Sequence, residues 1–174
     1  ALLVSASSAF AGGFINQSQS TVYNGTAYAG YAAPGSSPSS MFLNPATITE
    51  FHRITTENNF SLVIPNTKIN GTGVLGTAAS GDIGQDALVP ASYLVVPLTD
   101  RLYFGAAFNA PFGLTTKPDK PWGGQLNSMT TKARTYNLTP SLAYKVSDTV
   151  SLGFGVQAQL FDAKFTSAIG AGAN

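Results

Sequence analysis

The sequence predicts an all-β fold: a transmembrane antiparallel β-barrel, represented here by about five strands, that follows an N-terminal plug. Three observations support this prediction. Apolar residues alternate with small or polar ones from Val150 to Leu160, which is the period of a strand with one apolar face. Charged residues make up only 10% of the chain, against about 25% in ordinary soluble domains. The connections between predicted strands alternate between long and short, as outer loops and periplasmic turns do in bacterial barrels.

The rest of the composition narrows the function classes. The net charge is +1 and no basic block is present, so we do not expect nucleic acid as a partner. Cysteine is absent, which excludes a disulfide framework and thiolate metal sites. No apolar run approaches the roughly 20 residues that a transmembrane helix needs.

Residues 1–11 are predicted to be the remnant of a secretory signal peptide. An apolar start is followed by small residues, and Ala9-Phe10-Ala11 has the A-x-A pattern of a cleavage site. An ordinary first strand or helix is the alternative interpretation. If the segment is a signal, the mature protein starts near Ala11 or Gly12 and leaves the cytoplasm, and the sequence begins within its own signal.

Residues 12–52 show neither a helical nor a strand period and are predicted to form the plug. They are rich in Gly, Ser and Asn, and residues 34–38 (Pro-Gly-Ser-Ser-Pro) are strong turn formers. Scattered aromatic residues argue against a flexible linker, which would be depleted in them. We therefore expect a small packed segment.

Residues 53–174 are predicted to hold the first five barrel strands, at residues 54–69, 87–98, 101–114, 131–146 and 149–160. The long connections, near residues 70–86 and 115–130, are the predicted extracellular loops. In the third strand the even-numbered residues from Leu102 to Leu114 are expected to share one apolar face. In the fourth, Tyr136 and Tyr144 are separated by about 20 Å along the barrel axis, close to the distance between two aromatic girdles.

Four prolines fall within predicted strands, at positions 90, 97, 111 and 140. Proline has no N–H to donate to a neighbouring strand, so each predicts a kink, a bulge or a local gap in pairing. The segment Asn-Ala-Pro-Phe-Gly at residues 109–113 places proline and glycine close together in a long strand. We expect the main break in the wall there.

The residues give no support for catalysis. His52 is the only histidine, so a triad or a histidine metal site has no geometry to rest on. Residues 71–76 match G-x-G-x-x-G, but no helix-forming sequence follows, so a dinucleotide site is not expected. We predict no enzyme activity, no catalytic residue, no cofactor and no metal. Trp122, the only tryptophan, lies in a loop stiffened by prolines and is either an apolar docking site or an interfacial anchor.

Several of these features together resemble the FadL family, outer-membrane transporters of long-chain fatty acids with relatives that take up aromatic hydrocarbons. Asn44-Pro45-Ala46, just before the first strand, resembles part of that family's hatch. Residues 11–14 (Ala-Gly-Gly-Phe) are similar to its mature N-terminus, and residues 109–114 are similar to its inwardly kinked third strand. The resemblance covers the chain after the signal remnant. About five strands cannot enclose a plug, and an open edge is not viable in lipid, so we expect an N-terminal piece of a longer protein.

The resemblance implies a route for the ligand. A hydrophobic molecule would land on the outer loop at residues 115–129 and pass to a lumenal pocket that the extreme N-terminus enters. It would leave sideways into the membrane at the kinked strand, by passive diffusion. The implied ligand-binding or gating residues are Gly13, Phe14, Asn44, Pro45, Ala46, Asn109, Pro111, Phe112, Gly113 and Trp122. The implied partners are fatty acids or aromatic hydrocarbons and outer-membrane lipid, for a monomeric barrel in the outer membrane of a Gram-negative bacterium.

One departure leaves the substrate open. Fatty-acid members of the family place an arginine just beyond the fifth strand, where this chain has Ser167, with Lys164 as the nearby cation. Uptake of aromatic hydrocarbons is therefore an alternative. A structural barrel or general porin is another, although porin lumens carry rings of charge that these strands lack. A secreted soluble β-sandwich is the third, although its open face would carry more Lys and Glu.

Overall fold

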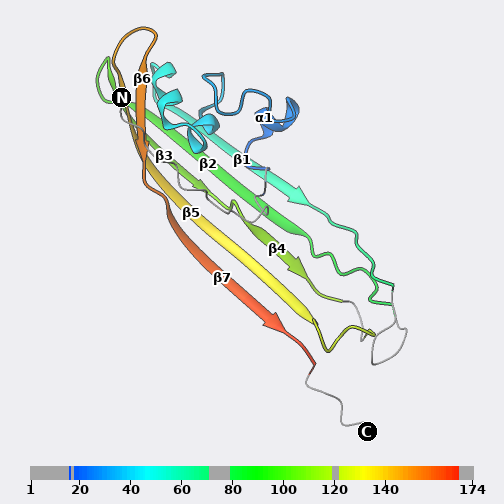
Figure 1. Ribbon diagram of the computed structural model, residues 1–174. Helices are drawn as coiled ribbons and strands as arrows, with labels where there is room; N and C mark the ends of the chain where they lie inside the picture. Colours follow the sequence, from blue (N-terminus) through cyan, green and yellow to red (C-terminus); the bar gives the residue numbers. More distant parts are fainter. Residues whose placement is uncertain (1–15, 17, 71–78, 119–121, 169–174) are drawn as a thin grey trace, which may run out of the picture.

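The computed structural model describes residues 16, 18–70, 79–118 and 122–168. They form one antiparallel sheet with an N-terminal segment packed against one of its faces (Figure 1). The strands are β1 (Thr55–Val63), β2 (Ala87–Pro97), β3 (Leu102–Asn109), β4 (Gly113–Thr116), β5 (Thr130–Lys145), β6 (Ser151–Gly155) and β7 (Ala158–Thr166). The all-β prediction is confirmed, and the sheet is open.

Most paired strands are neighbours along the chain, but β3 and β7 each pair with β5 across an intervening strand. β1 pairs with β2, and β2 pairs with β3. β5 pairs with β3 and β4 along one edge and with β6 and β7 along the other. The third and fifth predicted strands are therefore each divided in two. Short turns join β2 to β3 and β5 to β6 at one end, and the long connections lie at the opposite end (Figure 1).

The division of the fifth strand follows from a proline in its partner. The pairs Ser141↔Gly155 and Leu138↔Ala158 belong to one continuous register, so β6 and β7 are collinear parts of a single strand. Between them the Val156 N–H donates to the Pro140 carbonyl at 3.1 Å, but Pro140 has no N–H to return the bond. The local gap expected at this proline is confirmed, without any change of register.

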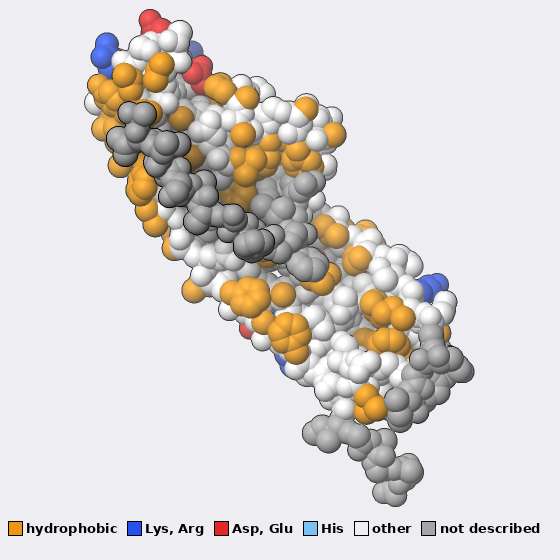
Figure 2. Space-filling model, in the orientation of Figure 1, with side chains coloured by type: hydrophobic (Ala, Val, Ile, Leu, Met, Phe, Trp, Pro, Cys, Tyr) orange, Lys and Arg blue, Asp and Glu red, His pale blue; other side chains and the backbone are white. Residues whose placement is uncertain are grey.

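The two faces of the sheet differ sharply in exposure. Apolar side chains on one face are open to the surroundings, with Leu152 64% and Leu160 74% exposed. The opposite face is buried along β5, where Thr135, Asn137, Thr139 and Ser141 alternate with the exposed residues. Figure 2 shows hydrophobic side chains along the length of the molecule, with charged side chains at the end with the short turns and others further along. The apolar face is thus outward and the polar face inward, as a barrel in lipid requires and a soluble sandwich does not.

The N-terminal segment covers the inner face near the short turns. It contains one α-helical turn, α1 (Thr21–Gly25), and two 3-10 helices, η1 (Pro38–Phe42) and η2 (Pro45–Glu50). Met41 and Ile48, both fully buried, pack into a core with inward side chains of the strands: Ala91, Tyr93, Val95, Tyr103, Ala107 and Ala143. This core explains the weak alternation of β2, whose inner face meets the plug while its outer face is also apolar.

The plug lies close to the wall because the wall carries glycine where the two meet. A Cβ on Gly153 would come within 2.2 Å of the Ala46 nitrogen, and one on Gly105 within 2.5 Å of the Met41 methyl carbon. Hydrogen bonds complete the contact. The Thr21 hydroxyl donates to Asn59 at 2.6 Å, and the Thr49 hydroxyl to Ser151 at 2.9 Å. None of the helices in the described ranges combines the length and the apolar character needed to cross a membrane.

Candidate functional site

The main irregularity of the wall lies between β3 and β4. β3 ends at the pair Asn109↔Asn137, and β4 begins at the pair Gly113↔Arg134. The chain therefore advances four residues while β5 advances three, so one residue is extra. An extra residue in one strand of an antiparallel pair is a β-bulge, which bends the strand. The predicted break at residues 109–113 is present.

The bulge also reverses the two faces of the strand. Directly paired residues project from the same side of a sheet, and a shift of one residue moves every later side chain to the other face. Leu114 pairs with Ala133, on the inner face, and the Phe112 carbonyl accepts the Thr135 N–H at 3.0 Å. Phe112 and Leu114 therefore point inward. The expectation that they share the outer face with Phe104 and Phe108 is wrong.

The bulge is held by side chains of β5. The Thr135 hydroxyl accepts the Phe112 N–H at 2.8 Å and donates to the Phe112 carbonyl at 2.6 Å. The side chain of Asn137 donates to that of Asn109 at 2.9 Å, with both residues buried. These bonds replace part of the regular ladder that the bulge interrupts.

The plug satisfies the remaining carbonyl groups of the bulge. The Asn16 N–H donates to the Pro111 carbonyl at 2.6 Å. The Gln19 side-chain nitrogen donates to the Ala110 carbonyl at 3.0 Å and to the Asn16 carbonyl at 3.1 Å. Gln19 is only 1% exposed, so these bonds are shielded from water. The N-terminal end of the plug is thus directly bonded to the break in the wall.

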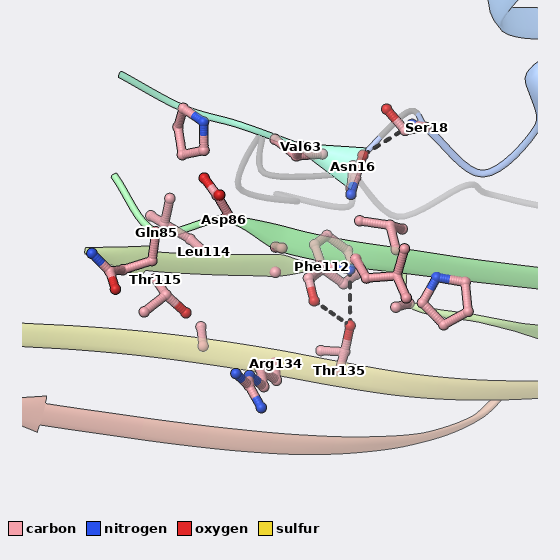
Figure 3. Close-up of a pocket in the computed structure, with 18 of the residues that line it drawn as sticks. Asn16, Ser18, Val63, Gln85, Asp86, Phe112, Leu114, Thr115, Arg134 and Thr135 are labelled. Carbon is pink, nitrogen blue, oxygen red and sulfur yellow. Dashed lines mark hydrogen bonds between the residues drawn. The ribbon is translucent and has the colours of Figure 1, made fainter. Parts of the chain in front are cut away.

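The break leaves an opening between β2 and β4. Pairing of β2 with β3 ends at Ala91↔Asn109, and β4 pairs with β5 but not with β2. A cavity of about 800 Å³ lies at this place (Figure 3). Its lining comes from both faces of the sheet: Ala87, Val89, Phe112 and Thr135 from the inner face, and Leu88, Gly113, Arg134 and Tyr136 from the outer face. Residues of both faces of the wall therefore line the cavity.

The inner face beside this cavity is apolar. Phe112, which directly precedes β4, lies in one row with Thr135 of β5 and Phe161 of β7. In the next row Leu114 of β4 is followed by the small residues Ala133 and Ala163. Strands lie about 4.8 Å apart, so the two phenylalanines stand about 10 Å apart, with Thr135 between them. Phe161 was not among the predicted site residues. Continuing the alternation of the fifth strand past Leu160 would have placed it on the inner face.

The Asn-Pro-Ala segment begins η2 and anchors the plug. The Asn44 side chain accepts the Ala46 N–H at 3.1 Å as the N-cap, and Pro45 occupies the first helical position, where a missing N–H costs nothing. The Asn44 amide group also donates to the Ala32 carbonyl at 3.0 Å. Together with the close approach to Gly153, these contacts fix the plug to the wall at a distance from the cavity.

The remaining predicted residues lie elsewhere. Trp122 donates through its indole nitrogen to the Ser128 carbonyl at 3.1 Å, within the loop, and it does not line the cavity. Gly13 and Phe14 lie outside the described residues. The structure thus brings together Phe112 and Gly113 at the cavity, with Asn109 and Pro111 beside them.

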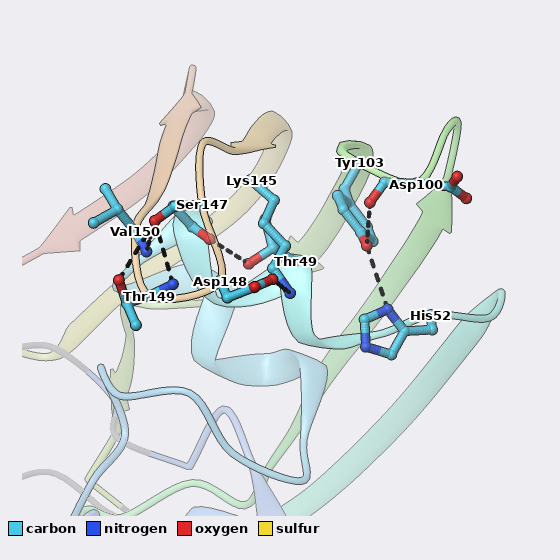
Figure 4. Close-up of polar contacts among 10 residues, drawn as sticks. Thr49, His52, Asp100, Tyr103, Lys145, Ser147, Asp148, Thr149 and Val150 are labelled. Atoms are coloured by element: carbon cyan, nitrogen blue, oxygen red, sulfur yellow. Dashed lines mark hydrogen bonds and ion pairs between the residues drawn. The ribbon is translucent and has the colours of Figure 1, made fainter.

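The polar residues at the short-turn end have structural contacts (Figure 4). The Tyr103 hydroxyl lies 3.4 Å from His52 Nδ1 and also donates to the Asp100 carbonyl at 3.3 Å. Lys145 forms an ion pair with Asp148 at 3.8 Å. His52 therefore connects the end of the plug to β3. In the described part of the chain, no group of three or more His, Cys, Asp or Glu side chains is placed to hold a metal ion.

The first long connection is organised around one carboxylate. Asp82 accepts the N–H groups of Thr67 at 2.9 Å and Gly84 at 3.0 Å. These two bonds, the Thr67 bond foremost, lower the pKa of Asp82 below its ordinary value. Gly84 in turn forms a bridge with Thr116, which joins the loop to the end of β4 beside the cavity.

An inner plug, an outward apolar face and a cavity lined from both faces of the wall define an outer-membrane β-barrel protein with an internal plug. Comparison with known proteins identifies the family: the model described as "Outer membrane protein transport protein (OMPP1/FadL/TodX)" matches residues 2–173. The chain belongs to this family, whose relatives below include outer-membrane proteins of Gram-negative bacteria. The resemblance found in the sequence, and the predicted location, are thereby confirmed.

Three relatives illustrate the match. The long-chain fatty acid transport protein of Escherichia coli K12 is 33% identical over 141 residues, covering 80% of this chain and 32% of the relative. Outer membrane protein P1 of Haemophilus influenzae Rd is 31% identical, covering 91% of this chain and 38% of the relative. The crystal structure of a Pseudomonas aeruginosa FadL homologue superposes with a TM-score of 0.71 at 28% identity, covering 90% of this chain and 39% of that one. The chain thus spans about a third of the length of the curated relatives it matches.

Proposed function

We propose that these residues form the plug and first wall strands of a transporter that carries hydrophobic molecules, foremost long-chain fatty acids, across the outer membrane. Transport is passive, and the molecule leaves sideways between β2 and β4 into the bilayer. The observation that carries the proposal is the cavity lined from both faces of the wall at the bulge. The names of the relatives support the substrate class.

The physical argument is that an amphiphile gains nothing from entering water. The inner surface beside the cavity offers Phe112, Leu114 and Phe161, and the outer surface beyond it offers Leu88 and Tyr136. A fatty acid that slides from the first group to the second keeps its chain in contact with apolar groups throughout. Such a path requires no catalytic step and no cofactor, and the proposal includes neither.

We further propose that the N-terminus controls this path. Gly13 and Phe14 precede Asn16, whose N–H is bonded to the Pro111 carbonyl. Movement of the N-terminus would pull on Asn16 and Gln19 and release the carbonyl groups of the bulge. Asn109, Pro111, Phe112 and Gly113 form the gate in this scheme, and Asn44, Pro45 and Ala46 hold the rest of the plug still. Trp122 would contact ligand first, on the outer loop.

Aromatic hydrocarbons are the second candidate substrate, because no cation faces the inside beside Phe112 and Phe161 in the described strands. Lys164 pairs with Lys132, on the outer face, so its side chain does not point to the lumen. Competition of toluene with labelled oleate for uptake distinguishes the two substrates. Inhibition of oleate uptake by toluene at similar concentrations would favour the aromatic substrate.

The lateral path can be tested by closing the opening. These 174 residues contain no cysteine, so Leu88→Cys and Gly113→Cys introduce one pair in this part of the protein, on the two sides of the cavity. We expect that a reducible bifunctional thiol reagent lowers oleate uptake at least ten-fold in the double variant and that reduction restores it. Each single variant treated with the same reagent is the control. Unchanged uptake in the cross-linked protein would disprove lateral exit.

A further inference from the structure

The charged residues of the described strands are concentrated in one place. Lys132 and Arg134 lie on β5, and Asp162 and Lys164 lie opposite them on β7, in the direct pairs Lys132↔Lys164 and Arg134↔Asp162. The only other charged residues in these strands are Glu57, on the inner face, and Lys145, at the short-turn end. We call Lys132, Arg134 and Lys164 the outer-face cation cluster.

The cluster faces the membrane side of the wall. Tyr136 and Leu160 form a direct pair, and both are exposed on the outer face, at 45% and 74%. Side chains return to the same face every second residue. Arg134 and Asp162 come two residues further along their strands, and Lys132 and Lys164 four residues further. All four side chains therefore project on the apolar side of the sheet.

Their depth corresponds to the headgroup layer of the outer leaflet. Tyr136 is the upper tyrosine of the apolar band, at the end of β5 that leads to the long loops. With a rise of about 3.3 Å per residue and a tilt of about 40°, Arg134 lies roughly 5 Å above Tyr136 and Lys132 roughly 10 Å above it. Long basic side chains at this height reach the layer that contains lipid phosphates.

The positive charge of the cluster is not balanced within the described strands. Three basic side chains stand beside one acidic side chain, Asp162. Lys132 and Lys164 are directly opposite each other, an arrangement that destabilises a sheet unless an anion lies between the two charges. Arg134 and Asp162 are both described, and they form no ion pair within 4.0 Å. The ion pair found within the described residues joins Lys145 to Asp148. Figure 3 shows the Arg134 side chain on the β7 side of β5.

We propose that the outer-face cation cluster binds the phosphate group of a phosphorylated glycolipid in the outer leaflet. A phosphate between Lys132 and Lys164 would remove their mutual repulsion, and the planar guanidinium group of Arg134 matches two phosphate oxygens at once. The ligand is a lipid because the apolar face begins directly below, at Tyr136, Leu138 and Leu160, where acyl chains can lie. The site lies beside the cavity, so the bound lipid would border the opening.

The test uses the protein expressed from its complete gene, folded in neutral detergent, with diphosphorylated lipid A as the probe. In the variant Lys132→Gln/Arg134→Gln/Lys164→Gln we expect the affinity for lipid A to fall at least ten-fold. The matched control is Arg101→Gln/Lys145→Gln, which removes cations at the opposite end of the strands and should bind lipid A like the parent. Dephosphorylated lipid A should bind the parent as weakly as the probe binds the triple variant. Native mass spectrometry measures the occupancy.

Two further variants keep the test decisive. Asp162→Asn removes the one negative charge and should tighten lipid A binding, and Lys164→Gln alone should weaken it at least three-fold if the triple variant does not fold. Resistance of the folded barrel to unfolding on unheated gels checks folding. Equal binding by the parent and a folded triple variant would overturn the proposal. So would displacement of lipid A by millimolar inorganic phosphate, because the site would then recognise a free anion rather than a lipid.

Discussion

Replacing Thr135 with valine tests whether its hydroxyl holds the bulge open. Valine keeps the shape of threonine, so the change removes two hydrogen bonds and little packing. The Phe112 N–H loses the hydroxyl that accepts it, while the Phe112 carbonyl keeps the Thr135 N–H at 3.0 Å. A buried donor left unpaired costs about 1–3 kcal/mol, and Phe112 is only half-buried, so we expect about 1–2 kcal/mol.

Hydrogen exchange measures this change where it occurs. A loss of about 1–2 kcal/mol corresponds to exchange roughly 5- to 30-fold faster at the Phe112 and Thr135 amide groups, provided that they exchange by local opening. Thr131→Val is the control, because Thr131 is on the same inner face of β5 and its hydroxyl contacts only Ser128, at 3.2 Å. If exchange at Phe112 is as slow in Thr135→Val as in the control, Thr135 does not hold the bulge, and β3 and β4 are separated for another reason.

Three other predictions address the plug and the outer loop. Gln19→Met removes the donors to the Ala110 and Asn16 carbonyl groups, so proteolysis should cut the N-terminal end of the plug faster while the strands stay protected. Uniform protection would contradict this role. Gly153→Val should displace the plug and lower the midpoint of unfolding, because even a Cβ would lie 2.2 Å from the Ala46 nitrogen. Gly25→Ala, with open space around its Cβ, should leave that midpoint unchanged. The pKa of Asp82 is lower in the folded protein than in the unfolded chain, so its contribution to the loop is present at neutral pH and is lost as the pH falls through the folded pKa. Amide exchange at Thr67 and Gly84 should therefore accelerate as the pH is lowered through that pKa, after correction for intrinsic rates, and no longer respond to pH in Asp82→Asn.

The sequence was a good guide to the strands and a poor guide to the direction of the side chains after the break. Alternation alone identified the outer faces of β5 and β6, because no extra residue interrupts the alternation of faces along either strand. Pro111 and Gly113 correctly located the break in the third strand. They did not reveal that one extra residue is inserted, because the register is defined by the partner strand, and only the pair Gly113↔Arg134 shows it. The inward position of Phe112 follows from that pair.

The second strand was ambiguous for a different reason. Its outer residues face lipid and its inner residues, such as Tyr93 and Val95, pack against Met41 and Ile48 of the plug. Both faces are therefore apolar, and alternation disappears although the strand is regular. The plug itself was recognised only as a packed segment without a period. Its docking depends on glycines at 105 and 153, which lie more than 50 residues further along the chain.

The contacts at the bulge suggest why a plugged wall can still open. Two donors from the N-terminal end of the plug, Asn16 and Gln19, bind the carbonyl groups of Pro111 and Ala110. Each such bond contributes about 0.5–1.5 kcal/mol net, so the pair contributes about 1–3 kcal/mol, a bias of roughly 5- to 150-fold toward the arrangement in which plug and wall are joined. Burying one or two methylene groups of a ligand supplies about 0.8 kcal/mol each, which is the same order. We infer that, in the proposed scheme, burial of about four methylene groups of a ligand against Phe112 and Phe161 is enough to offset even the upper value of this bias.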